Sequence, residues 1–134
     1  MLVLDASAVL AWAYDDEGGI ADAVIDHVTE DAAFVPAHWI LEVTNTLLIS
    51  ERRGRLKAGQ RHDILDRIRQ LPVRVDLETP IHGWTQIPEL AIRFRLTTYD
   101  AAYLELALRM DAPLATLDKD LKRAAREAGV PLFE

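Results

Sequence analysis

The chain has 134 residues, half of them hydrophobic, which is enough apolar material for the core of one compact domain. Its 22 acidic and 15 basic residues give a net charge of −7, which argues against a nucleic-acid binder that relies on an overall positive field. It has no cysteine, which excludes disulfides, thiolate zinc sites and cysteine nucleophiles.

Targeting signals are not expected from this sequence. No hydrophobic run approaches the roughly 18 residues that a transmembrane helix needs. The first residues do not combine a basic leader, an apolar stretch and a small-residue cleavage site. We therefore expect a cytoplasmic protein with no membrane partner, folded as a single domain over residues 1–134.

The amino-terminal half predicts short strands that alternate with helices. Leu2-Val3-Leu4 is an unbroken apolar run, typical of a strand covered on both faces, and Asp5 follows it directly. Ser7 is available to cap the helix that comes next. Helical composition or periodicity predicts helices over residues 6–14, 20–28, 36 or 37 to 53, and 57–71. A turn rich in acids and glycine is expected over residues 15–19, and a second strand over residues 33–35.

The carboxyl-terminal half continues the alternation. We expect strands over residues 73–75, 113–116 and 132–133, and helices over residues 81–94, 99–110 and 118–128. Pro88 should kink or shorten the first of these helices, and Gly129 should stop the last. Trp12, Trp39 and Trp84 are expected in the core. Short strands that alternate with helices indicate an α/β fold with a parallel central sheet.

Four acidic residues follow successive elements of this pattern. Asp5 comes directly after the first strand, and Asp118 lies two residues beyond the fourth. Asp100 opens a helix, where the helix dipole favours a carboxylate, and Glu42 lies in the first two turns of the helix after the second strand. Each acid alone is also consistent with a helix cap or a solvated surface residue. In an open parallel sheet, however, functional groups gather at the carboxyl ends of the strands, so the four predicted positions converge.

This convergence favours a metal site. Carboxylates that lie close together repel one another and resist ionisation, and no lysine or arginine lies in the local sequence around Asp5, Glu42 or Asp100. A hard divalent cation held by oxygen ligands would resolve the conflict, and Mg²⁺ or Mn²⁺ is the natural candidate. The four histidines show no paired ligand spacing, which argues against zinc, although His38 could approach the site near Glu42.

Several segments together resemble the PIN-domain ribonucleases, most closely the VapC-type toxins of bacterial and archaeal toxin–antitoxin pairs. The resemblance rests on Asp5-Ala6-Ser7, on Glu42 with Asn45, on residues 98–104 and on residues 115–118. The Tyr-Asp-Ala-Ala-Tyr stretch from Tyr99 and the threonine two residues before Asp118 are its more specific parts. The likeness covers nearly the whole chain.

The resemblance implies a three-layer α/β/α fold and Mg²⁺- or Mn²⁺-dependent endonucleolytic cleavage of RNA, which leaves 5′-phosphate and 3′-hydroxyl ends. The residues that it assigns to the metal site are Asp5, Glu42, Asp100 and Asp118. The neighbouring polar groups that it assigns to orienting ligands or water are Ser7, Asn45 and Thr116. It also implies a homodimer and a cognate antitoxin, which could pack near Trp12 and Tyr14 in a groove between helices.

Two basic clusters could contact RNA phosphates, or could be ordinary solvated helix surface. One surrounds the turn between the third and fourth predicted helices, over residues 52–61. The other lies on the last helix and consists of Lys119, Lys122, Arg123 and Arg126. The second cluster is the better candidate because it begins beside Asp118.

Other functions remain open at this point. A PIN-domain nuclease could serve RNA maturation or decay as a housekeeping enzyme, and a non-catalytic interaction module could keep an acidic pocket. A phosphotransfer enzyme of the haloacid-dehalogenase type also places an aspartate after its first strand, but it needs a second acid where this chain has Ser7. A receiver-type signalling module would need a lysine after a late strand, and none is well placed.

Overall fold

The computed structural model describes residues 1–14 and 19–134, so the turn expected over residues 15–19 lies, apart from Gly19, outside the described residues. Four strands in these residues form one parallel sheet in the order β3-β2-β1-β4. The strands are β1 (Leu2–Leu4), β2 (Ala33–Val35), β3 (Val73–Val75) and β4 (Leu114–Ala115). The parallel sheet that the sequence predicted is confirmed.

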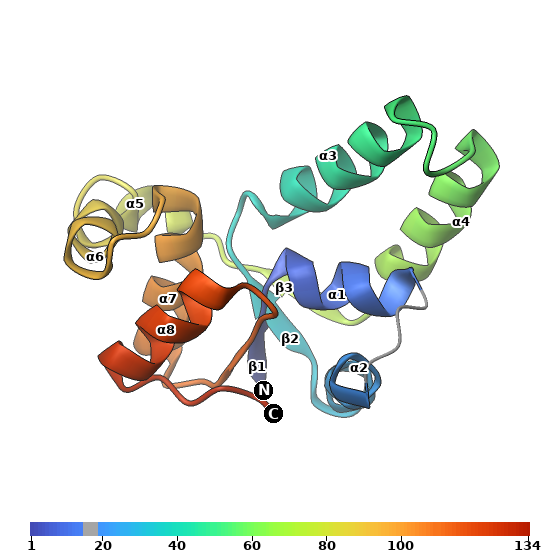
Figure 1. The fold of residues 1–134 in the computed structure, drawn as a ribbon. Coiled ribbons are helices and arrows are strands. Elements are labelled where there is room, and N and C mark those ends of the chain that lie inside the picture. The colour runs from blue at the N-terminus through green and yellow to red at the C-terminus, as the bar shows by residue number, and fades with distance from the viewer. Residues whose placement is uncertain (15–18) are drawn as a thin grey trace.

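Eight helices in the described residues flank this sheet. Those on one side are α1 (Ala6–Ala13), α2 (Gly19–Asp31), α3 (Trp39–Arg52) and α4 (Ala58–Arg69). Those on the other side are α5 (Thr79–His82), α6 (Gln86–Phe94), α7 (Thr98–Met110) and α8 (Lys119–Ala128). Figure 1 shows the sheet between the two groups, with the chain termini close together at one end. This is the expected three-layer α/β/α arrangement.

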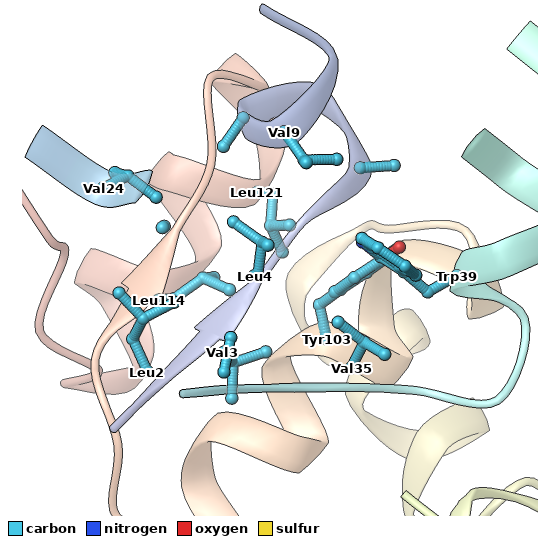
Figure 2. Packing of buried hydrophobic residues seen from close by; sticks show 14 of the residues in the cluster. Leu2, Val3, Leu4, Val9, Val24, Val35, Trp39, Tyr103, Leu114 and Leu121 are labelled. Carbon is cyan, nitrogen blue, oxygen red and sulfur yellow. The ribbon is translucent and has the colours of Figure 1, made fainter. Parts of the chain in front are cut away.

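The central strand β1 lies in the middle of the hydrophobic core. Its three residues have no exposed surface, as expected for a strand covered on both faces. Figure 2 shows them among side chains from the flanking elements, including Val9 of α1 and Leu121 of α8. Burial of apolar surface stabilises this strand by roughly 25 cal/mol per Å². The strand therefore holds Asp5, the residue that follows it, in a fixed position.

The predicted helix over residues 81–94 is divided into α5 and α6, with a break at residues 83–85. Pro88 occupies the third position of α6. In a first helical turn the missing N–H of proline would have had no partner inside the helix, so Pro88 is tolerated there. Pro88 therefore shortens the helix, which is one of the two effects expected of it.

Two local expectations were wrong. Trp84 is 88% exposed, because it lies in the break between α5 and α6 and not on a helical face that packs on the sheet. Trp39 is buried, as expected. Residues 132–133 form only an isolated bridge from Leu132 to Leu114, since β4 offers only two residues for pairing.

Within residues 1–14 and 19–134, no helix combines the length and the apolarity that crossing a bilayer would require.

Candidate active site

The carboxyl ends of the parallel strands bring the predicted acids to one edge of the sheet. The Asp5 backbone N–H donates to the carbonyl of Ala115 at 3.0 Å, so the residues that follow β1 and β4 leave the sheet side by side. A cavity of about 290 Å³ opens at this edge. The residues that line it are Asp5, Ala6, Ser7, Leu10, Glu42, Thr46, Asp100 and Asp118. All four predicted acids therefore face one space, which we call the acid cavity.

Asp5 is the most deeply placed of the four acids, with only 5% of its surface exposed. Its Oδ2 atom accepts hydrogen bonds from the hydroxyls of Ser7 at 2.6 Å and Thr116 at 2.7 Å. Burial raises the pKa of Asp5, the two hydroxyls oppose this rise by stabilising the carboxylate, and the charge of Glu42 adds to it. Asp5 is thus a buried acid held in one orientation by two donors.

The hydroxyls of Ser7 and Thr116 each connect Asp5 to the loop after β4. Ser7 Oγ accepts from the Leu117 N–H at 3.0 Å, and Thr116 Oγ1 accepts from the Asp118 N–H at 3.0 Å. Each hydroxyl therefore donates to Asp5 and accepts from a backbone amide. The expectation that Ser7 caps α1 was wrong: this helix has no side-chain cap, because the Ser7 oxygen accepts from the Leu117 N–H instead.

Asp118 combines a capping contact with a place in the acid cavity. Its Oδ1 atom accepts from the Leu121 N–H at 2.8 Å and so caps the amino terminus of α8. The Oδ2 atom makes no hydrogen bond within the described part of the chain. The helix-cap reading and the site reading of Asp118 are therefore compatible, because they use different oxygens.

Glu42 reaches the acid cavity from α3 and is held through one oxygen. Its Oε1 atom accepts from the Tyr103 hydroxyl at 2.7 Å and lies 3.0 Å from Nε2 of His38. Burial and the nearby charges of Asp5 and Glu42 raise the pKa of Tyr103 above its usual range, so it remains a neutral donor. The contact of His38 with Glu42 agrees with the expectation that this histidine could approach the site.

Asp100 shows most directly that the acids influence one another. It lies in the first turn of α7, where its backbone N–H donates to the capping hydroxyl of Thr97 at 3.1 Å. Burial, followed by the charges of Asp118, Asp5 and Glu42, raises the pKa of Asp100 to about 6. The acid cavity therefore concentrates negative charge. Among the described residues that line it, no basic side chain is present to neutralise this charge.

The donor chemistry of the acid cavity suits a hard divalent cation, because its charged groups are carboxylates. In the described residues, however, no three Asp, Glu or His side chains are already gathered closely enough to hold one ion. Carboxylates without a shared cation repel one another, so a spread arrangement is the one that electrostatics favours. Metal binding would therefore require side-chain rotation within the cavity.

Some polar groups differ from the expected set. Asn45 does not line the acid cavity but an adjoining one, together with Glu42 and Asp100, whereas Thr46 does line the acid cavity. Thr46 lies four residues after Glu42 and therefore on the same helical face, so this spacing could have identified it. Tyr103 also belongs to the site and was expected only as an apolar helix position. Its place three residues after Asp100 was the available signal.

The basic residues of α8 do not enter the acid cavity. Lys119 is exposed and Lys122 is half-buried. Arg123 points elsewhere, since its Nη2 donates to the carbonyl of Phe94 at 3.0 Å and its Nη1 lies 3.5 Å from Glu127. Arg123 therefore connects α8 to the end of α6.

Comparison with known proteins agrees with this geometry. The sequence model of the PIN domain matches residues 2–127, and the chain belongs to the PIN domain family. The chain is 28% identical over 130 residues to Ribonuclease VapC3 of Pyrobaculum aerophilum, covering 90% of this chain and 91% of that protein.

Two solved structures share the fold. The crystal structure of PAE2754 from Pyrobaculum aerophilum has a TM-score of 0.67 and 25% identity, and the match covers 92% of this chain and 83% of that one. The crystal structure of FitAcB from Neisseria gonorrhoeae has a TM-score of 0.65 and 16% identity, and the match covers 100% of this chain and 97% of that one. The second likeness concerns the fold alone.

Proposed function

We propose that this chain, as one domain over residues 1–134, is a Mg²⁺- or Mn²⁺-dependent endoribonuclease. The observation that carries this proposal is the convergence of Asp5, Glu42, Asp100 and Asp118 on one cavity, where burial and mutual repulsion raise the pKa of Asp100 to about 6. Such an arrangement opposes ionisation of the acids, and a bound cation would compensate for it. Membership of the PIN domain family and the likeness to Ribonuclease VapC3 support RNA as the substrate.

The four carboxylates would hold the ion, and their hydrogen bonds leave oxygens for it. Glu42 uses Oε1 for its contacts and Asp118 uses Oδ1, so Oε2 and Oδ2 are without hydrogen bonds in the described part of the chain. Ser7 and Thr116 would keep Asp5 oriented toward the cavity. A bound divalent ion would supply the Lewis acidity that lets water attack a phosphodiester at neutral pH, and would offset the phosphate charge.

Cleavage assays test this proposal. Purified protein would be incubated with structured and unstructured RNAs, with EDTA, Mg²⁺ or Mn²⁺, and the cuts mapped by their end groups. We expect metal-dependent cuts that leave 5′-phosphates, and a loss of at least a hundredfold in Asp5→Asn and Asp100→Asn while circular dichroism stays native. Equal cutting by the Asp5→Asn variant and the parent protein would remove the metal-site proposal.

The phosphate-binding part of the proposal concerns Lys119 and Lys122. Both lie on α8, which begins next to Asp118, and neither side chain forms an ion pair within the described residues. Charge reversal of both lysines should weaken RNA binding and flatten its dependence on salt. Arg123→Gln is the matched control, because Arg123 is bonded to Phe94 and should change RNA binding little.

We further propose that the enzyme is the toxin of a VapBC-type pair, works in the cytoplasm as a homodimer and is inhibited by a cognate antitoxin. The likeness to a VapC-named ribonuclease supports this role. Expression of the chain should arrest growth, and co-expression of a small gene immediately upstream should restore it. Expression without growth arrest would favour a housekeeping role in RNA maturation or decay.

A further inference from the structure

A second cavity adjoins the acid cavity. It has a volume of about 450 Å³ and shares Glu42 and Asp100 with the acid cavity as common walls. Its remaining lining comes from His38, Leu41, Asn45, Thr97 and Tyr99. We call this space the flanking cavity. Because the two cavities share walls, an RNA strand whose reacting phosphate lies in the acid cavity would place a neighbouring nucleotide in the flanking cavity.

Tyr99 and Leu41 are the exposed large side chains that line the flanking cavity, and Tyr99 supplies an aromatic ring. Tyr99 lies in the first turn of α7, immediately before Asp100, and is 65% exposed. Its ring packs against the His38 ring, with centroids 5.7 Å apart and planes inclined by 55°. The His38 side chain is itself held, since Nε2 lies 3.0 Å from the Tyr99 carbonyl oxygen and 3.0 Å from Glu42. The ring is therefore supported from one side while most of its surface remains available.

Charge selects the kind of group that the flanking cavity can accept. Among the described residues that line it there is no lysine or arginine, whereas Glu42 and Asp100 carry carboxylates. A phosphate would be repelled there, but an uncharged, planar and partly apolar group would not. Asn45 adds an amide donor and an amide acceptor, and its side chain makes no hydrogen bond to the residues described. This combination of an exposed ring and a free amide suits a nucleobase.

We infer that Tyr99 is a substrate-positioning residue that stacks an unpaired base of single-stranded RNA next to the phosphate that is cleaved. Asn45 contacts the edge of the same base. The base that stacks on Tyr99 must be unpaired, because a base within a helix cannot expose its face to the ring. This inference rests on the proposed nuclease function, but it concerns binding and can be tested separately.

The test uses binding of short single-stranded RNA to an Asp5→Asn background, which is expected to prevent cleavage and which leaves every residue of the flanking cavity intact. An abasic nucleotide is moved through each position of the RNA, and affinity is measured by fluorescence anisotropy in Mg²⁺. With Tyr99 present, loss of the base at one position should weaken binding by roughly 5- to 100-fold. In Tyr99→Ala this positional penalty should fall below about twofold, and Tyr99→Phe should retain it.

Two further variants and one measurement complete the design. Trp84→Ala removes another exposed aromatic residue, which does not line either cavity, and should leave the penalty unchanged. Asn45→Ala should keep the penalty but change which of the four bases binds best there. Sedimentation velocity would show whether Tyr99→Ala alters self-association instead.

The inference is overturned if Tyr99→Ala keeps the full positional penalty, if no position shows one, or if this variant changes only the oligomeric state. The nuclease proposal can fail independently. If the Asp5→Asn background shows the base penalty but the parent protein cuts no RNA, the base site is retained and the nuclease proposal fails. If the parent protein cuts RNA but the Asp5→Asn background shows no such penalty, the nuclease proposal is retained and the base site fails.

Discussion

The hydroxyl of Tyr103 donates a hydrogen bond to Oε1 of Glu42 over 2.7 Å, although the two residues are 61 positions apart in the chain. Tyr103 has no exposed surface, so α7 presents this hydroxyl from within the core. Glu42 comes from a helix, whereas Asp5 is fixed directly by the end of a strand. The orientation of Glu42 therefore depends on the packing of α7 against the sheet.

Replacing Tyr103 by Phe should remove this hydrogen bond and keep the ring packing. Because the acceptor is a carboxylate, we expect the free energy of unfolding to fall by about 1.5–3 kcal/mol, together with a lower rate of metal-dependent RNA cleavage. Urea unfolding at pH 7.5 measures the first effect. Tyr14→Phe is the control, since its hydroxyl pairs with the neutral Ser50 Oγ at 3.1 Å and should cost only about 0.5–1.5 kcal/mol. Equal losses in the two variants would contradict the charged contact.

Asp100→Asn should stabilise the protein at neutral pH in the absence of divalent ions. The pKa of Asp100 is about 6 in the folded protein, above its ordinary value of 3.8, so the folded state binds more protons between these two values. Stability contributed by this group is therefore lost as pH rises from about 4 to 6. The full shift corresponds to about 3 kcal/mol, and solvent screening of this half-buried carboxyl reduces the expected gain to about 1–2 kcal/mol.

Urea unfolding in EDTA at pH 7.5 and pH 4 measures this gain in stability. At pH 4 the gain should shrink to roughly a few tenths of a kcal/mol. Asp63→Asn on the exposed surface of α4 is the control and should show no such pH dependence. If Asp100→Asn destabilised the protein equally at both pH values, the pKa of Asp100 would not be raised in the folded protein by burial and the neighbouring acids.

Thr116 should be needed for its hydroxyl rather than its size. Thr116→Val removes one of the two donors to the buried Asp5 carboxylate, so we expect a loss of about 1–3 kcal/mol in stability and a further rise in the pKa of Asp5. Thr116→Ser keeps the donor and should retain most of the activity. Unfolding curves and the pH profile of cleavage distinguish the two variants, and equal behaviour would mean that the hydroxyl does not hold Asp5.

Arg109 should be a strong stabilising residue outside the acid cavity. Its guanidinium contacts the carboxylates of Asp76 and Glu105, and Glu105 is only 5% exposed. Burial by itself would raise the pKa of Asp76, but the hydrogen bonds from Arg109 and Thr79 outweigh burial and lower it.

Arg109→Met leaves Glu105 without this partner, so we expect a loss of about 3–5 kcal/mol. Arg126→Met removes an exposed pair with Glu134 at 3.4 Å and should cost no more than about 1 kcal/mol. Similar losses for the two arginines, measured by thermal unfolding, would show that burial of Glu105 does not matter.

The sequence was sufficient for features that local chemistry determines. An apolar triplet before Asp5 indicates a strand that ends on a carboxylate, and Gly129 adopts a φ of 78° where α8 ends. Most residues do not favour this left-handed conformation, so a glycine there is a readable stop signal. Parallel strands then place their carboxyl ends together, which is why the four acids could be predicted to meet.

Contacts between distant segments were harder to predict. Tyr103 has the periodicity of a core residue, and nothing near it in sequence identifies Glu42 as the acceptor of its hydroxyl. Trp84 was expected in the core because periodicity does not show whether another element covers a given face. The Ser7 oxygen accepts from the Leu117 N–H, which lies 110 residues away, rather than from the amino terminus of its own helix, and nothing in the local sequence identifies this donor.

The central claim is that Asp5, Glu42, Asp100 and Asp118 hold a divalent ion together. Mn²⁺ binding followed by electron paramagnetic resonance tests this claim most directly, because free Mn²⁺ is counted without reference to activity. We predict that the parent protein removes Mn²⁺ from solution, that Mg²⁺ displaces it, and that Asp5→Asn and Asp100→Asn weaken binding by at least tenfold while Asp63→Asn does not. Equal Mn²⁺ binding by all four proteins, or none by the parent, would contradict the account.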